Sequence, residues 1–330
     1  MKPVSRVVLC VALGAAAALA QTVISAKSGM IHYLEGQVFL GDQAIENKFG
    51  SFPEVKENAT LRTEEGRAEV LLTPGVFLRL AENSSFRMIT NRLVDTRLEL
   101  LSGAAVLEVD DMPKDNGVTV ACKDVSVRLM KKGLYRFDAQ PPAVRVFDGE
   151  ALATSGDRTV EVKEGKMLTL DSELAVAKFD KESTDALDRW SRRRGHDLAM
   201  ANVSAANSLR TSGTTWNSSG WMWNPYFGMF TFVPYSGSYY SPYGYRFWSP
   251  LAVYQVYQPR YYYGGNAYPS YGGGGSGYST VPRTSSGYSG VIASAPAAAA
   301  APAHAPTTSA GAAPSAPVSR GGGSAGGAHR

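Results

Sequence analysis

The sequence predicts an all-β fold, an antiparallel sandwich or solenoid-like β domain, followed by one α-helix and a disordered tail. Apolar and polar residues alternate with a period of two over most of Ser25 to Leu170, which is typical of half-buried strands. Turn residues recur roughly every 8–12 positions, the spacing of a sandwich or barrel. No long helical pattern separates the strands, which argues against a parallel α/β sheet.

The composition divides the 330 residues into five expected segments. These are a signal peptide at 1–20, an all-β domain at 21–175, a helix and linker at 176–209, an aromatic Gly/Pro-rich extension at 210–263 and a disordered low-complexity tail at 264–330. All 29 acidic residues precede Leu198, whereas only arginines supply charge after residue 209. The body is thus mildly acidic and the tail weakly basic. Neither has the dense basic patch of a nucleic-acid-binding protein, so we expect no nucleic-acid partner.

The N-terminus is typical of a cleaved secretory signal. Lys2 and Arg6 precede an apolar run, and small residues at Ala18 and Ala20 come directly before Gln21. The alternative is an uncleaved anchor, but the run is shorter than the roughly 20 residues that span a membrane. We therefore expect no transmembrane span in the mature chain and a location in the periplasm or at the cell surface.

The most informative stretch is Ala68–Met88. It predicts two half-buried strands around Pro74-Gly75, a second turn at Glu82-Asn83 and then a third strand. Alternation on both sides of the second turn places four apolar side chains inside: Leu78, Leu80, Phe86 and Met88. Another turn is expected at Glu65-Gly66.

Cys122 is the only cysteine expected in the mature chain, so no internal disulfide can form. It falls on a strand pattern, and burial as a small apolar residue is favoured over a reactive thiol.

A single helix is expected from Asp180 to about Ala205, capped by Asp180, Ser183 or Thr184. Its apolar stripe consists of Leu187, Trp190 and Leu198, provided that the helix tolerates Gly195. We interpret the basic run Arg192–Arg194 as a solvated face, with a phosphate or membrane contact as the alternative.

The stretch Ala68–Met88 resembles the FecR domain. So do Gly133-Leu-Tyr-Arg-Phe-Asp, Val144-Arg-Val-Phe-Asp-Gly-Glu and the strand pattern that begins at Val162. The resemblance covers roughly Ser28 to Leu170, and it implies an all-β domain on the non-cytoplasmic side of the inner membrane. The best-known FecR proteins are signalling regulators with a cytoplasmic anti-sigma segment and one membrane span. Here only six residues precede an apolar run that is typical of a cleaved signal.

Aromatic residues crowd the segment from Trp216 to Tyr263. The stretch Tyr243–Phe247 predicts a short strand between Ser241-Pro242 and Ser249-Pro250. Three interpretations remain open: rings packed on the β domain or on each other, a platform for glycans or cell-wall polymer, and a membrane-interface or adhesive segment. The candidate ligand-stacking residues are Trp221, Trp223, Tyr226, Phe230, Tyr245 and Trp248.

Enzymatic interpretations lack the necessary residues. The four histidines show no metal-ligand spacing, and no phosphate loop or nucleophile motif is present. The carboxylate pairs Asp110-Asp111 and Asp180/Glu182 are expected in exposed loops without shifted pKa values. We therefore name no catalytic, cofactor-binding or metal-binding residue and expect no enzymatic activity.

Our main hypothesis is a non-enzymatic, exported binding or structural module of the cell envelope. The expected partner is an envelope protein or a cell-wall or glycan polymer. The alternative is a periplasmic sensor or regulator of envelope signalling that acts through a separate membrane partner.

Overall fold

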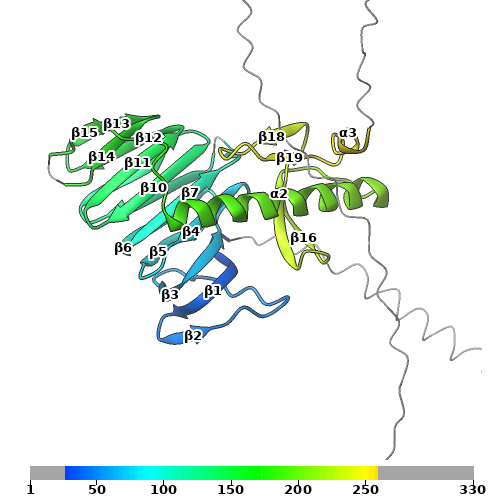
Figure 1. The fold of residues 1–330 in the computed structure, drawn as a ribbon, viewed down its shortest axis with the longest axis horizontal. Coiled ribbons are helices and arrows are strands. Elements are labelled where there is room, and N and C mark those ends of the chain that lie inside the picture. The colour runs from blue at the N-terminus through cyan, green and yellow to red at the C-terminus, as the bar shows by residue number, and fades with distance from the viewer. Residues whose placement is uncertain (1–26, 114, 172, 259–330) are drawn as a thin grey trace, which may run out of the picture. The chain divides into compact units, whose positions relative to one another are not determined.

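The computed structural model describes residues 27–113, 115–171 and 173–258. The predicted signal peptide at 1–20 and the predicted disordered tail at 264–330 lie outside these ranges. The described chain is mostly β, as the sequence predicts, with one long helix (Figure 1). The segment boundaries given above remain predictions.

Fifteen strands form one sheet. They are β1 (Met30–Leu40), β2 (Gln43–Ile45), β3 (Thr60–Leu71), β4 (Val76–Leu80), β5 (Ser85–Arg92), β6 (Asp95–Ser102), β7 (Ala104–Val109), β8 (Gly117–Cys122), β9 (Val125–Leu129), β10 (Gly133–Ala139), β11 (Pro142–Asp148), β12 (Glu150–Ser155), β13 (Arg158–Lys163), β14 (Lys166–Thr169) and β15 (Val176–Lys178).

The sheet follows the order β13-β12-β9-β8-β6-β5-β3-β4-β7-β10-β11-β14-β15, with β1 and β2 beside β3. It curves until β13 lies against β14, so it is nearly closed. The apolar core fills its interior. All pairs within it are antiparallel except β6 with β8. That pair is parallel because β7 leaves to join β4 and β10, and the chain then returns beside β6.

The predicted inward positions are confirmed, since Leu78, Leu80, Phe86 and Met88 are all buried. Cys122 is also buried. The expected turn at Glu65-Gly66 is wrong, because β3 runs straight through it. A Cβ on Gly36 would lie 2.0 Å from the Glu65 carbonyl oxygen. Gly36 pairs with Gly66, and these two glycines let β1 and β3 approach closely at this point.

The helix α2 (Ala186–Ser212) begins later and ends later than the sequence suggests. Asp185 is its N-cap and forms a capping box with Asp188, in place of the caps predicted at Asp180, Ser183 or Thr184. The predicted stripe of Leu187, Trp190 and Leu198 is buried.

Beyond α2 lie two small hairpins and a short helix. These are β16 (Gly220–Asn224) with β17 (Met229–Val233), β18 (Ser238–Tyr240) with β19 (Arg246–Trp248), and α3 (Tyr254–Tyr257). The aromatic strand predicted at Tyr243–Phe247 is displaced, because Tyr243 and Gly244 belong to the turn that precedes β19.

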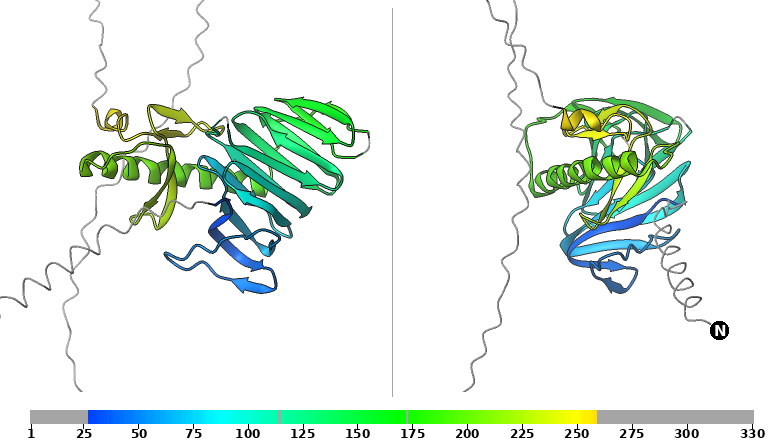
Figure 2. Two further views of the ribbon diagram at one scale, coloured as in Figure 1. Left: turned by 180° about the vertical axis from the view of Figure 1, so that it is seen from behind. Right: turned by 90° about the vertical axis from the view of Figure 1, so that its right-hand side faces the viewer.

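The N-terminal part of α2 packs on the sheet through Leu187 and Trp190, against Val106 of β7. Its C-terminal part packs against Val233 and Trp248 of the extension. Figure 2 shows the two hairpins gathered along this second half of the helix. No helix in the described ranges is both long and apolar enough to cross a membrane.

Candidate functional site

Strands β3, β4 and β7 bring ionisable side chains to the outer face of the sheet, where α2 and the extension cover them. Six residues, which we call the ionic cluster, are all buried there: His32, Glu69, Arg79, Glu108, Asp110 and Arg194. The cluster therefore contains ionisable groups from four strands and one helix in a region that excludes water. Such groups must satisfy one another, because an unpaired buried charge costs several kcal/mol.

Glu69 is the centre of the ionic cluster. Arg79 Nε donates to its Oε2 at 2.8 Å, and Arg194 Nη2 donates to its Oε1 at 2.8 Å. His32 Nδ1 lies 2.9 Å from the same Oε1. Burial alone would raise the pKa of Glu69, but Arg194 and Arg79 with His32 hold that pKa well below its usual range. Glu69 is thus a carboxylate that joins β1, β3, β4 and α2.

The second centre of the cluster is on β7. Arg79 Nη1 donates to Glu108 Oε2 at 2.6 Å. Burial raises the pKa of Glu108 against the opposing effect of Arg79. Burial followed by the charge of Glu108 raises the pKa of Asp110 well above its usual range. Protonation is therefore favoured more strongly at Asp110 than at Glu108, and the expectation that Asp110 lies in an exposed loop is wrong, because it is buried.

The basic run on α2 is not uniformly solvated, which corrects the interpretation given above. Arg192 and Arg193 are exposed, but Arg194 is buried with its guanidinium carbon 4.0 Å from the centre of the Tyr33 ring. Gly195 lets the helix approach the sheet at this point. A Cβ there would lie 3.2 Å from the Tyr243 ring and 3.4 Å from a Glu108 carboxylate oxygen.

Side-chain to backbone hydrogen bonds fasten the extension to α2. Asn202 Nδ2 donates to the carbonyl oxygens of Phe232 and Trp248, at 2.9 Å and 3.0 Å, and Asn202 Oδ1 accepts from the Trp248 N–H at 2.7 Å. Thr231 Oγ1 donates to the Leu198 carbonyl at 2.7 Å, and Asn224 Nδ2 donates to that of Ala201 at 2.9 Å. The hairpins are thereby held in a fixed position on the helix.

The six candidate stacking residues fall into two groups. Trp221, Phe230 and Trp248 are buried within the extension and its contacts. Trp223 and Tyr245 are half-buried, and Tyr226 is 92% exposed. Trp223, Phe230 and Tyr226 belong to the same hairpin, while Tyr245 and Trp248 belong to the other one. The rings of Trp221, Phe230 and Trp248 are thus occupied by packing. Those of Trp223, Tyr226 and Tyr245 keep free surface.

An open cleft of about 330 Å³ lies where the β16–β17 hairpin meets the loop between β2 and β3. We call it the aromatic cleft; it is lined by His32, Tyr33, Asn47, Lys48, Phe49, Phe52, Tyr226, Phe227, Gly228 and Met229. Phe49 is 80% exposed and Phe227 is 39% exposed. Exposed aromatic groups gathered around one hollow are typical of binding surfaces, which makes the aromatic cleft the candidate site.

Sequence reasoning missed Phe49, and it missed the ionic cluster. Phe49 lies within a turn of a polar loop, which the Ser51 N–H closes by donating to the Lys48 carbonyl, and Phe52 follows this turn directly. Phe49 contacts Trp223 edge to face at 5.8 Å between ring centres, and Phe52 contacts Phe230 at 5.1 Å. Two phenylalanines in a short polar loop were the available signal for this contact.

Two carboxyl groups of the ionic cluster, Glu108 and Asp110, have raised pKa values, which is a common sign of catalytic acids, but neither lines the aromatic cleft. Among the described residues, no group of three or more His, Cys, Asp or Glu side chains is placed to hold a metal ion.

Residues 59–166 match the family model described as FecR protein, which confirms the resemblance predicted above. Two crystal structures of a proposed anti-sigma factor from Parabacteroides distasonis are similar to part of the fold. They share 13% and 14% sequence identity with TM-scores of 0.32 and 0.31, over 41% and 40% of this chain. The chain spans 64% and 61% of those two structures, which is less than two thirds of either. No curated protein matches the chain.

Proposed function

We propose that this chain, which carries a FecR domain, is a non-catalytic regulator of envelope signalling that acts by binding a separate membrane protein. The family resemblance supports a regulatory role, because the best-known FecR proteins are signalling regulators. On this proposal the chain is exported by a cleaved signal and works in the periplasm. The FecR domain, α2 and the extension act as one binding body.

The observation that carries the proposal is the aromatic cleft. Phe49, Tyr226 and Phe227 expose large rings, while Asn47 and Lys48 supply polar groups at the same hollow. Aromatic side chains are enriched at the centres of protein interfaces and dominate their binding energy, with polar groups at the rim. A protein partner fits this arrangement.

The proposal is tested by photo-crosslinking in intact envelopes. A benzophenone amino acid replaces Tyr226 in the full chain, and in a matched control it replaces Tyr240, which is 59% exposed on β18 and does not line the cleft. We expect one membrane-protein adduct from position 226 and none from position 240. The adduct should disappear when Phe49→Ser is added.

Binding of the purified adduct partner then gives the magnitude. Tyr226→Ser should weaken its affinity by about 10-fold or more, as expected for an anchoring aromatic side chain, and Tyr240→Ser should leave it unchanged. If Tyr226→Ser instead abolishes co-sedimentation with isolated cell wall and no protein adduct forms, the cleft binds a glycan polymer and the protein-partner proposal is wrong.

A further inference from the structure

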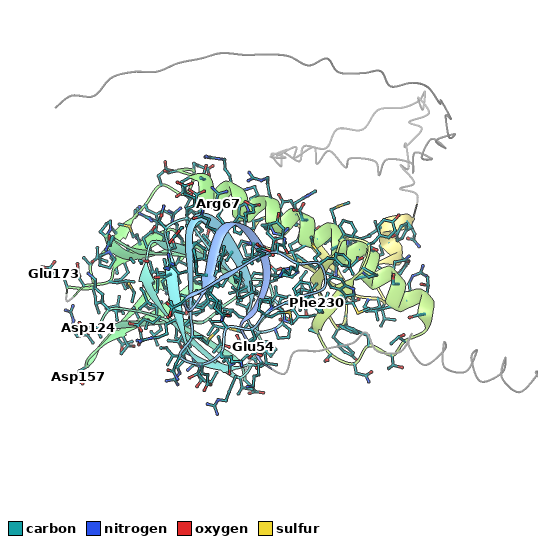
Figure 3. All side chains as sticks on the ribbon, turned by 90° about the horizontal axis from the view of Figure 1, so that it is seen from below. Glu54, Arg67, Asp124, Asp157, Glu173 and Phe230 are labelled. Carbon is teal, nitrogen blue, oxygen red and sulfur yellow. The ribbon has the colours of Figure 1, made fainter. Side chains whose placement is uncertain are left out.

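His32 connects the ionic cluster to the aromatic cleft. It is buried on β1, yet it lines the cleft beside Phe52 and Tyr33. Both ring nitrogens are in use. Nε2 lies 2.9 Å from the backbone nitrogen of Phe230, and Nδ1 lies 2.9 Å from Glu69 Oε1. Phe230 is labelled in Figure 3, on the hairpin that carries Tyr226.

These two contacts fix the protonation state of the ring. The Phe230 backbone group is a donor, so Nε2 must be the unprotonated acceptor. The single proton of the neutral ring then sits on Nδ1, and this N–H donates a hydrogen bond to the Glu69 carboxylate. A second proton on Nε2 would face the Phe230 N–H, which leaves two donors opposed and a buried backbone N–H without an acceptor.

The surrounding charges also favour the neutral ring. Facing His32 are Glu69 from β3, Arg79 from β4 and Arg194 from α2, and both guanidiniums already neutralise Glu69. From the hairpin, the ring of Phe230 adds an apolar wall, with its centre 6.4 Å from that of His32. Burial lowers the pKa of His32 below its ordinary value, although Glu69 opposes this effect.

We propose that His32 is an acid-sensitive latch: protonation of its Nε2 breaks the hydrogen bond to Phe230 and loosens the start of β17 beside the aromatic cleft, which reshapes the cleft. The hydrogen bonds that Asn224 and Thr231 make to α2 do not involve His32, so the opening is local to the Phe230 end of the hairpin. Only its consequence for partner binding rests on the proposed function of the cleft.

The sign of the pH dependence follows from linkage. Burial in the closed state holds the pKa of His32 below the ordinary histidine value of about 6.5, and opening relieves part of that burial, so the pKa rises toward the ordinary value. Closure is fully stable above that value and weakens as the pH falls below it, by up to about tenfold per pH unit. Glu69 keeps its charge to much lower pH. Glu108 and Asp110, with raised pKa values, titrate in the opposite direction, so the histidine must be isolated by substitution.

Hydrogen exchange of the full chain at pH 7.5 and pH 5.5, corrected for the intrinsic rates, tests the latch. In the wild type we expect opening at the Phe230 N–H and its neighbours at the start of β17 to increase about tenfold at pH 5.5, while β7 keeps its protection. His32→Gln supplies a carbonyl acceptor for the Phe230 N–H and does not titrate, so the increase should disappear. His196→Gln is the matched control: His196 is exposed on α2, and this variant should behave like the wild type.

Equal acid-induced opening in His32→Gln and the wild type would overturn the proposal. An increase below twofold in the wild type would do the same. If His32→Gln fails to fold, the wild-type imidazole signals measured by NMR decide the outcome, since the ring of His32 must gain its proton over the pH range in which the hairpin opens. If the hairpin opens in acid but crosslinking from position 226 does not change, the latch proposal stands. The proposed role of the aromatic cleft in partner binding is then wrong.

Discussion

The two faces of strands β3, β4 and β7 are both buried, but only the outer face, which also carries apolar residues such as Phe77 and Val106, buries charged side chains. The inner face carries apolar side chains such as Val70, Leu78 and Leu107, which pack against the rest of the rolled sheet. The outer face carries Glu69, Arg79 and Glu108 beneath α2 and the extension. The inner face needs only shape and area, whereas the outer face needs every charge to find its partner.

This difference predicts two separable layers of stability. The inner face holds the sheet itself, and the outer face holds its cover. All five tryptophans lie between Trp190 and Trp248, in α2 and the extension, so their fluorescence reports on the cover. Far-UV circular dichroism is dominated by the strands and reports on the sheet.

The largest expected effect is from Glu69→Gln. The substitution leaves Arg79 and Arg194 buried without their shared carboxylate, a loss of about 3–5 kcal/mol. In urea, the fluorescence transition should shift to lower denaturant much further than the circular dichroism transition. Leu78→Ala on the inner face is the matched control, at about 2–5 kcal/mol, and should shift both transitions together. Equal shifts of both transitions in Glu69→Gln would show that the two faces do not separate.

A smaller effect is expected at the junction of α2 with the hairpins. Asn202→Ala removes three hydrogen bonds to the backbone of Phe232 and Trp248 and leaves buried backbone groups unsatisfied. We expect a loss of about 1–3 kcal/mol in the fluorescence transition alone. Asn207→Ala, at a half-buried position on the same helix, should change it by less than about 0.5 kcal/mol. A shift of the sheet transition in Asn202→Ala would contradict the separation of the two layers.

Asp110→Asn is expected to stabilise the protein at neutral pH. The pKa of Asp110 is raised in the folded state, so folding favours its protonated form, and its cost increases as the pH rises above the unfolded value near 3.9. An amide removes that cost. The gain should be about 1 kcal/mol at pH 8 and should vanish near pH 4, as measured by urea unfolding across this range.

The control for that prediction is Asp124→Asn, at an exposed position in the turn between β8 and β9, labelled in Figure 3. It should leave the unfolding free energy unchanged at both pH values. A loss of stability in Asp110→Asn at pH 8 would mean that Asp110 is needed as a carboxylate.

The inner face could be predicted from the sequence because its signal is local. Leu78 and Leu80 alternate with Arg79, and alternation alone assigns them to one face. The same rule places Arg79 on the other face but cannot say what covers it. The cover comes from Arg194, which is 125 residues from Glu69, and from Phe230, which is 198 residues from His32. Sequence periodicity contains no information at that range.

The aromatic extension was the one available signal of that cover, because so many rings need a surface to pack against. Which of these rings are buried and which are exposed could not be fully predicted, since the same composition is compatible with both. Trp221 and Trp223 are two residues apart in β16, yet one is buried and the other half-buried. Trp221 packs against Phe77 of the sheet, whereas Trp223 is covered in part by Phe49 and Phe52 from a loop that is remote in sequence.

The smallest expected effect separates burial from geometry. Arg87 and Glu99 pair across β5 and β6 in a contact that is shorter than the 2.8 Å contacts of Glu69, but the Arg87 side chain is 46% exposed. A double-mutant cycle on this pair should give a coupling below about 1 kcal/mol, because water already solvates both charges. The same cycle on Arg194 and Glu69 should give a clearly larger coupling, because neither partner can recover its hydration when the other is removed. Since the exposed pair has the shorter contact, a coupling there equal to or above that of Arg194 and Glu69 would mean that contact geometry, and not the cover over the outer face, sets the strength of these ion pairs.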